Sequence, residues 1–156
     1  MIKPAVKTVF QQGRPGVVLL VEDNADHAFL AQEAFEETSQ KINLQHVDNG
    51  EKCLAFLRRQ PPYEFAPRPD LILLDIHMPR MNGFEVMEEI ACDESLRGIA
   101  VVVLTTSTEP QEVQRMYQLA CKSYLVKPVD FGVFSAAIKQ LVRYWFGLVL
   151  LAGPSA

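Results

Sequence analysis

Short apolar segments alternate along this chain with segments whose apolar residues recur at helical spacing, and this alternation limits the fold more than any other feature. The apolar segments are residues 17–21, 42–47, 70–74, 100–104 and 123–126. Each is long enough for a strand but too short for a helix, and each is followed by a helical pattern. Strands that alternate with helices predict an α/β fold, with a parallel sheet covered by helices on both faces.

The length of 156 residues predicts one folded domain with distinct ends. Residues 1–16 end in the breaker Arg14-Pro15-Gly16, which predicts a flexible N-terminal extension. The folded domain is expected to span residues 17–146, and residues 147–156 form an apolar C-terminal tail. Inside the domain, the proline-rich residues 61–69 predict a loop, and the alternating residues 42–47 predict an edge strand.

The charge pattern argues against nucleic acid and membrane as partners. The formal net charge is −4, and the basic residues are scattered rather than gathered in a stripe. The start of the chain lacks the apolar core of a signal peptide, and the apolar run at residues 148–151 is too short to span a bilayer. The three cysteines form no C-x-x-C pair, which indicates reduced thiols and predicts a cytoplasmic protein.

Polar side chains follow four of the predicted strands at the point where each strand ends. These side chains belong to Glu22, Asp23, Asp75, Thr105 and Lys127. Each one alone is explained by a helix cap or an exposed charge. In a parallel sheet, however, the carboxyl ends of the strands meet at one edge, where ligand sites form. The sequence therefore predicts one site made of three carboxylates, a hydroxyl and an ammonium group.

Clustered carboxylates repel one another unless a cation lies among them, and an all-oxygen ligand set suits Mg²⁺. Zinc is the weaker interpretation, because His27, His46 and His77 lack ligand spacing. A divalent cation beside a hydroxyl and an ammonium group suits phosphoryl transfer. A carboxylate can itself be the nucleophile of such a transfer, and Asp75, at the centre of the edge, is the candidate.

Four segments resemble the receiver domain of bacterial two-component response regulators: "LLVEDN", "LILLDIHMPRMNG", "VVVLTTS" and "SYLVKPVD". The resemblance covers about residues 17–145 and implies a flavodoxin-like, doubly wound (βα)5 fold with strand order 2-1-3-4-5. It also implies a signalling protein that accepts a phosphoryl group from a sensor histidine kinase and is not an enzyme, apart from its own phosphotransfer and dephosphorylation. The end of the chain resembles single-domain regulators that partner phytochrome-type histidine kinases.

The resemblance assigns roles to the residues that match its motifs. Asp75 resembles the phosphoacceptor, and Lys127 the residue that contacts the phosphoryl group. Thr105 and Tyr124 match the switch positions, where phosphorylation changes the face formed by the fourth helix, the fifth strand and the fifth helix. The Lys127–Pro128 bond is cis in that family.

The resemblance also assigns the metal ligands and two variable positions. Glu22 and Asp23 match the acidic pair that holds Mg²⁺, together with Asp75 and the backbone carbonyl of His77. His77 and Ser107 occupy the positions that tune dephosphorylation in the family, so the lifetime of the phosphorylated state stays open.

The apolar end of the chain predicts a homodimer. Its last helix and tail carry more apolar surface than one sheet face can cover, and such a surplus is usually buried. The expected interface includes Tyr144, Trp145, Phe146 and Leu148. The same stretch could instead fold back on its own domain.

Three other functions remain as alternatives. An aspartate-nucleophile, Mg²⁺-dependent phosphatase would need a D-x-D motif, but Asp75 is followed by Ile76 and His77. An FMN-binding protein would need a glycine-rich phosphate loop, where this chain has the acidic "EDNADH". A receiver-like interaction module that works without phosphorylation is opposed by the presence of every required side chain.

Overall fold

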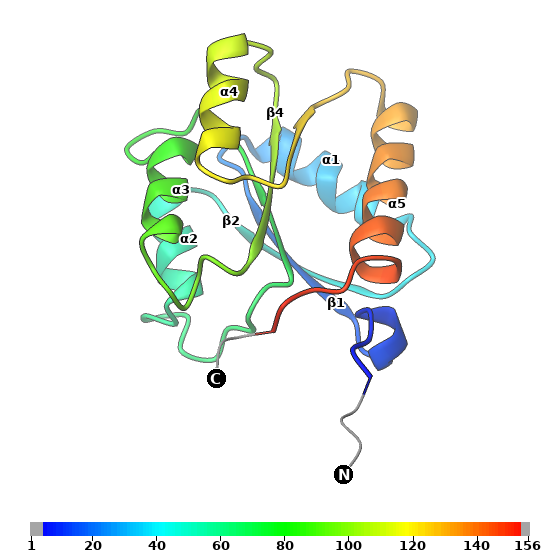
Figure 1. Cartoon of the computed structure of the whole chain (residues 1–156). Helices are drawn as coiled ribbons and strands as arrows, with labels where there is room; N and C mark the ends of the chain where they lie inside the picture. Colours follow the sequence, from blue (N-terminus) through cyan, green and yellow to red (C-terminus); the bar gives the residue numbers. More distant parts are fainter. Residues whose placement is uncertain (1–4, 154–156) are drawn as a thin grey trace.

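The computed structural model describes residues 5–153. A five-stranded parallel sheet has the strand order β2-β1-β3-β4-β5, and helices alternate with strands along the chain (Figure 1). The elements are β1 (Gly16–Val21), α1 (Ala25–Glu36), β2 (Ile42–Val47), α2 (Gly50–Leu57), β3 (Leu71–Leu74), α3 (Gly83–Ala91), β4 (Ala100–Thr105), α4 (Pro110–Gln118), β5 (Ser123–Val126) and α5 (Phe131–Gly147). The predicted fold class and strand order are confirmed.

Helices cover both faces of the sheet, with α1 and α5 on one face and α2, α3 and α4 on the other (Figure 1). Successive side chains of a strand point to opposite faces, so each strand supplies both cores. In β3, Leu71 and Leu73 pack toward α1 and α5, whereas Ile72 and Leu74 pack toward the other helices. All four are fully buried, which explains why the segment before Asp75 contains no polar residue.

The β2 strand lies at one edge of the sheet, as its alternating sequence predicted. Helix α3 begins after Asn82, where the Asn82 side chain accepts a hydrogen bond from the Glu85 backbone N–H at 3.0 Å and the Glu85 side chain accepts one from Asn82 N–H. This reciprocal cap satisfies two backbone donors and sets the start of the helix that follows Asp75.

Residues 8–15 differ from the flexible extension that the sequence predicted. Thr8 and Val9 are buried, and a short 3₁₀ helix at Phe10–Gln12 places the Phe10 ring 5.9 Å from the Phe146 ring. Arg14 donates two hydrogen bonds to the Asp70 carboxylate, at 2.7 and 2.8 Å. These contacts join residues far apart in sequence, so local patterns do not reveal them. Residues 1–4 of the extension lie outside the described residues.

The end of the chain corrects one predicted interface residue. Phe146 is completely buried in its own chain, against Phe10 and Gly16, because α5 turns this side toward the sheet. Leu151 packs against the same core, whereas Leu148 is exposed. Residues 154–156 of the predicted tail lie outside the described residues.

Two further features concern the backbone. Within residues 5–153, the cis peptide bond joins Pro61 and Pro62, so the Lys127–Pro128 bond is trans, unlike the form that the resemblance implied. The two isomers of such a bond differ by only about 0.5–1 kcal/mol, so a motif alone does not decide between them. In the same part of the chain, no helix is both long and apolar enough to cross a membrane.

Candidate functional site

The predicted site residues come together at the carboxyl edge of the sheet because the strands end there in register. Val21 pairs with Leu74, so the residues that follow them, Glu22 and Asp75, leave neighbouring strands side by side. Thr105 pairs with Val126, the residue before Lys127. The edge thus gathers side chains that are distant in sequence.

Three carboxylates form the centre of this edge. Glu22, Asp23 and Asp75 each place a carboxylate oxygen within 4.8 Å of the others. Glu22 is 2% exposed and Asp75 is 8% exposed, whereas Asp23 lies at the surface. This all-oxygen set, open to solvent on the Asp23 side, fits a divalent cation such as Mg²⁺, which keeps several water ligands.

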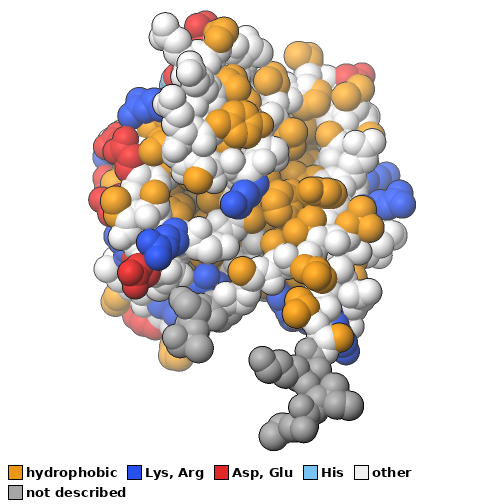
Figure 2. Space-filling model, in the orientation of Figure 1, with side chains coloured by type: hydrophobic (Ala, Val, Ile, Leu, Met, Phe, Trp, Pro, Cys, Tyr) orange, Lys and Arg blue, Asp and Glu red, His pale blue; other side chains and the backbone are white. Residues whose placement is uncertain are grey.

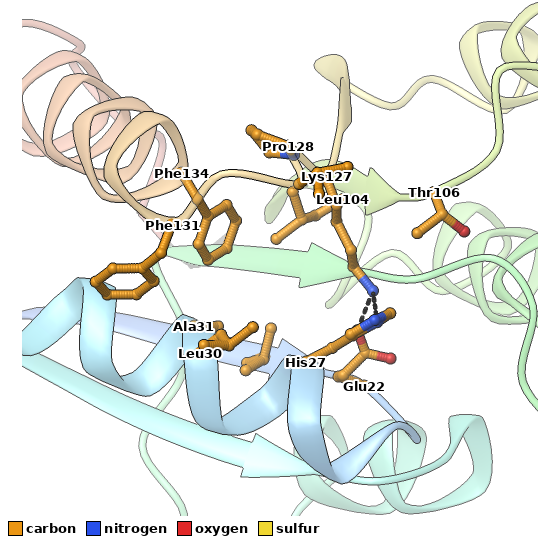
Figure 3. A pocket seen from close by; sticks show the side chains of 12 residues that line it. Glu22, His27, Leu30, Ala31, Leu104, Thr106, Lys127, Pro128, Phe131 and Phe134 are labelled. Atoms are coloured by element: carbon orange, nitrogen blue, oxygen red, sulfur yellow. Dashed lines mark hydrogen bonds and ion pairs between the residues drawn. The ribbon is translucent and has the colours of Figure 1, made fainter.

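Lys127 reaches from the end of β5 toward Glu22 and His27 (Figure 3). Its Nζ atom contacts Glu22, lies 3.5 Å from Asp75 Oδ2 and lies 3.0 Å from Nδ1 of His27. His27 begins the buried side of α1 and is half-buried, as expected for a packed histidine. Its contact with Lys127 was not predicted, because 100 residues separate the two.

The cluster holds more negative charge than its own cation balances. Burial raises the pKa of Glu22 to about 7, the nearby Asp75 carboxylate contributes to this rise, and Lys127 acts in the opposite direction. A carboxylate that keeps its proton near neutral pH marks a place where a second positive charge would be favoured. The electrostatics therefore agree with the ligand chemistry.

Thr105 and Tyr124 share a neighbour, Ser107. Thr105 is completely buried, and its Oγ1 accepts a hydrogen bond from the Ser107 backbone N–H at 3.4 Å. The Tyr124 hydroxyl donates a hydrogen bond to the Ser107 carbonyl oxygen at 2.9 Å. Both predicted switch residues therefore contact the loop between β4 and α4.

A glutamate that the sequence reasoning missed joins the two tuning positions. Glu112 Oε1 lies 2.9 Å from His77 Nε2 and also accepts a hydrogen bond from the Ser107 hydroxyl. The sequence carries no signal for the pairing with His77, which is 35 residues away. The Nε2 atom of His46, the remaining histidine, lies 2.9 Å from the backbone oxygen of Glu22.

An apolar hollow of about 270 Å³ opens between α1 and α5, directly beside Lys127 (Figure 3). Leu30, Leu104 and Phe131 are among the residues that line its walls. Val129, which also lines the hollow, is fully exposed to solvent. The site thus has a charged centre with an apolar surface next to it.

Residues 18–139 match the response regulator receiver domain. The chain belongs to the response regulator receiver family. It is 36% identical to the response regulator Rcp1 of Synechocystis over 88% of this chain and 93% of that protein. It is also 36% identical to the probable methanogenesis regulatory protein FilR2 of Methanothrix harundinacea, over 94% of each chain.

Solved receivers have the same fold. The phosphorylated cyanobacterial phytochrome response regulator RcpA superposes with a TM-score of 0.85 and 33% identity, covering 90% of this chain and 100% of that one. The Mn²⁺-bound form of Rcp1 superposes with a TM-score of 0.82 and 36% identity, covering 89% and 100%. The receiver is thus related to phytochrome response regulators. A relative with a bound divalent metal ion agrees with a metal-binding role for the acidic cluster.

Proposed function

We propose that this receiver is a single-domain response regulator that accepts a phosphoryl group on Asp75 from a sensor histidine kinase, in a Mg²⁺-dependent reaction in the cytoplasm. The observation that supports this most directly is the position of Asp75. Its buried carboxylate lies in the three-carboxylate cluster and 3.5 Å from the Lys127 ammonium group. A nucleophile, a metal-binding set and a cation for the phosphoryl oxygens are therefore within reach of one another.

The chain's own residues account for the transfer. The Asp75 carboxylate attacks the phosphorus of a phosphohistidine, the new P–O bond forms as the P–N bond breaks, and the histidine nitrogen leaves with the electron pair. Lys127 stabilises the charge on the phosphoryl oxygens, and Ile76 N–H holds one Asp75 oxygen at 2.8 Å. A Mg²⁺ ion held by Glu22, Asp23, Asp75 and the His77 carbonyl would neutralise further charge there.

Phosphorylation would act on the two switch residues. A phosphoryl group on Asp75 offers new acceptors to the Thr105 hydroxyl, whose oxygen now accepts a hydrogen bond from the Ser107 backbone N–H at 3.4 Å. Movement of that loop alters the Ser107 carbonyl to which Tyr124 donates. The face of α4, β5 and α5 would change with it. A shift from 1% to 99% of the active state needs about 5.5 kcal/mol of differential interaction.

The apolar hollow beside Lys127 supports a kinase partner. A partner that presents a phosphohistidine to Asp75 must approach over the same edge of the sheet, where Leu30, Val129 and Phe131 expose apolar surface. Burial of such a surface is the usual driving force of association. The likeness to phytochrome regulators makes a bacteriophytochrome the proposed kinase.

A small acyl-phosphate donor tests the phosphoryl transfer. The receiver is incubated with the donor, with and without Mg²⁺, and its intact mass is followed. A Mg²⁺-dependent adduct supports the proposal. Turnover of the donor without an adduct would favour the phosphatase alternative. If neither an adduct nor turnover appears, whether the small donor or the kinase is used, the interaction module would be favoured.

We expect Asp23→Asn to lower the affinity for Mg²⁺ at least about tenfold, because a carboxylate about 4 Å from a divalent ion contributes on the order of 2 kcal/mol even in water. Asp23 is exposed, so the fold should tolerate the change. Calorimetric titration with Mg²⁺ measures the effect. The matched control is Asp26→Asn, which removes an exposed carboxylate from the first turn of α1. Equal affinities for both variants would remove Asp23 from the ligand set.

We also propose a homodimer through the face of α4, β5 and α5. Figure 2 shows hydrophobic side chains gathered on the face between α4 and α5. The exposed large hydrophobic residues of this region include Tyr117, Val126, Val133, Tyr144 and Leu148. Phe146 takes no part because it is buried, and Trp145 is half-buried beside Tyr144, their rings 5.4 Å apart.

Sedimentation velocity at micromolar concentration should show a dimer, and Tyr144→Glu should shift it toward the monomer by placing a charge in an apolar interface. Phe65→Glu is the control, since Phe65 is 99% exposed in the loop between α2 and β3. A monomeric unsubstituted protein would contradict the proposed dimer.

A further inference from the structure

Three side chains form a bridge between the loops that follow β3 and β4. We name the side chains of His77, Glu112 and Ser107 the carboxylate bridge. Glu112 Oε1 is its centre, because it lies 2.9 Å from His77 Nε2 and accepts a hydrogen bond from the Ser107 hydroxyl as well. One oxygen atom of α4 therefore contacts a side chain from each of the two loops.

The bridge lies beside the proposed phosphoacceptor. His77 is two residues after Asp75, and Ser107 is two residues after Thr105, the last residue of β4, so each end of the bridge lies two residues from a residue of the site. The strands before them, β3 and β4, are hydrogen-bonded neighbours. The bridge consequently connects the loops at the two strand ends that Asp75 and Thr105 occupy.

Both contacts of the bridge end on the same side chain. The Glu112 side chain is 21% exposed, whereas the His77 side chain is 63% exposed. Glu112 Oε1 accepts a hydrogen bond from the Ser107 hydroxyl and lies 2.9 Å from His77 Nε2. The less exposed Glu112 therefore restrains both side chains.

The bridge is also connected to the switch residue Tyr124. Ser107 uses its hydroxyl for Glu112 and its carbonyl oxygen for the Tyr124 hydroxyl, which donates at 2.9 Å. The Ser107 hydroxyl further accepts a hydrogen bond from the Glu109 backbone N–H at 3.3 Å. The start of α4, the β4–α4 loop and β5 thus meet at one serine.

We propose that Glu112 is a positioning residue that prolongs the lifetime of the phosphoryl group on Asp75 by holding His77 and Ser107 in place beside it. This inference rests on the proposed function. Hydrolysis requires a water oxygen to attack the phosphorus while the P–O bond to Asp75 breaks. Asp75 then leaves as a carboxylate, and the water protons go to inorganic phosphate and solvent. Two restrained side chains leave fewer paths for that water than two mobile ones.

The test follows the decay of the phosphoryl adduct by intact mass after the acyl-phosphate donor is removed. We expect Glu112→Ala to shorten the half-life roughly three- to tenfold, the range that loss of one or two restraining hydrogen bonds gives. Glu112→Gln keeps an oxygen acceptor for both donors, so the half-life of its adduct should be close to that of the unsubstituted protein. Glu109→Ala is the matched control, since this N-cap residue makes no side-chain cap hydrogen bond.

A second comparison separates positioning from a general effect on the fold. In a chain that already carries His77→Ala and Ser107→Ala, the further change Glu112→Ala should leave the decay rate unchanged, because the bridge has no donors left. Circular dichroism checks that each variant is folded.

Two results would overturn the inference, and they can be told apart. If the unsubstituted protein forms the adduct but Glu112→Ala decays at the same rate, only the role of Glu112 fails. If no Asp75-dependent adduct forms with the small donor or with the kinase, the proposed function fails and the lifetime role fails with it. The positioning role would also be rejected if Glu112→Ala accelerated the decay of the adduct equally in the chain that carries His77→Ala and Ser107→Ala.

Discussion

Asp75→Asn should abolish the phosphoryl adduct completely while leaving the protein folded. An amide is too poor a nucleophile to form the acyl phosphate, whereas its shape and its oxygen match those of aspartate. The amide oxygen of the variant can still accept the hydrogen bond that Ile76 N–H now donates to Asp75 Oδ1 at 2.8 Å. Intact mass after incubation with a small acyl-phosphate donor and Mg²⁺ measures the result.

The comparison needs a variant with the same chemical change elsewhere. Asp48→Asn provides it, because Asp48 is exposed before α2 and forms a surface ion pair with Lys52. This variant should be labelled like the unsubstituted protein. An adduct that persists in Asp75→Asn would place the acceptor on another residue and overturn the assignment of Asp75.

Gly83→Ala should destabilise the protein by about 1–3 kcal/mol, the usual effect of overpacking a well-packed region. A Cβ atom at Gly83 would lie 2.5 Å from the Asp75 carbonyl oxygen and 2.9 Å from the Ile76 Cα atom. Both are backbone atoms of the segment that carries the phosphoacceptor, so neither can move away cheaply. Helix propensity favours alanine by about 1 kcal/mol at most, which is too little to compensate.

Urea unfolding measures this effect as a lower midpoint with an unchanged slope. Gly98→Ala is the matched control, because no atom of residues 5–153 lies within 4 Å of a Cβ atom placed there. The Cβ atom in Gly83→Ala would also push the backbone of Asp75 away from its position, which should lower the yield of the phosphoryl adduct. A midpoint equal to that of Gly98→Ala would show that the α3 helix can shift without cost.

The core of the site was predictable because it depends on where strands end. In a buried strand such as β3, the first polar residue marks the exit from the core, and parallel strands bring these exits to one edge. Glu22, Asp75 and Thr105 are recognisable in this way from residue type alone. The edge strand β2 and the helix start at Asn82 were predictable for similar reasons, since both depend on neighbouring residues.

Contacts between distant residues could not be predicted in this way. The packing of Val9 and Phe10 on α5 contradicts the flexible extension that the composition of residues 1–16 suggested. Phe146 was expected at a dimer interface because periodicity does not tell which apolar side of a helix faces the sheet.

The sequence by itself determined the α/β class, the order of elements and the polar residues that close each strand, because hydrophobic periodicity and strand ends are local properties. Only the tertiary structure decided which side chains meet beyond those ends. The contacts of Lys127 with His27, and of Glu112 with His77 and Ser107, depend on the angle and the register at which helices pack on the sheet. Those quantities arise from the packing of the whole core, and no single segment determines them.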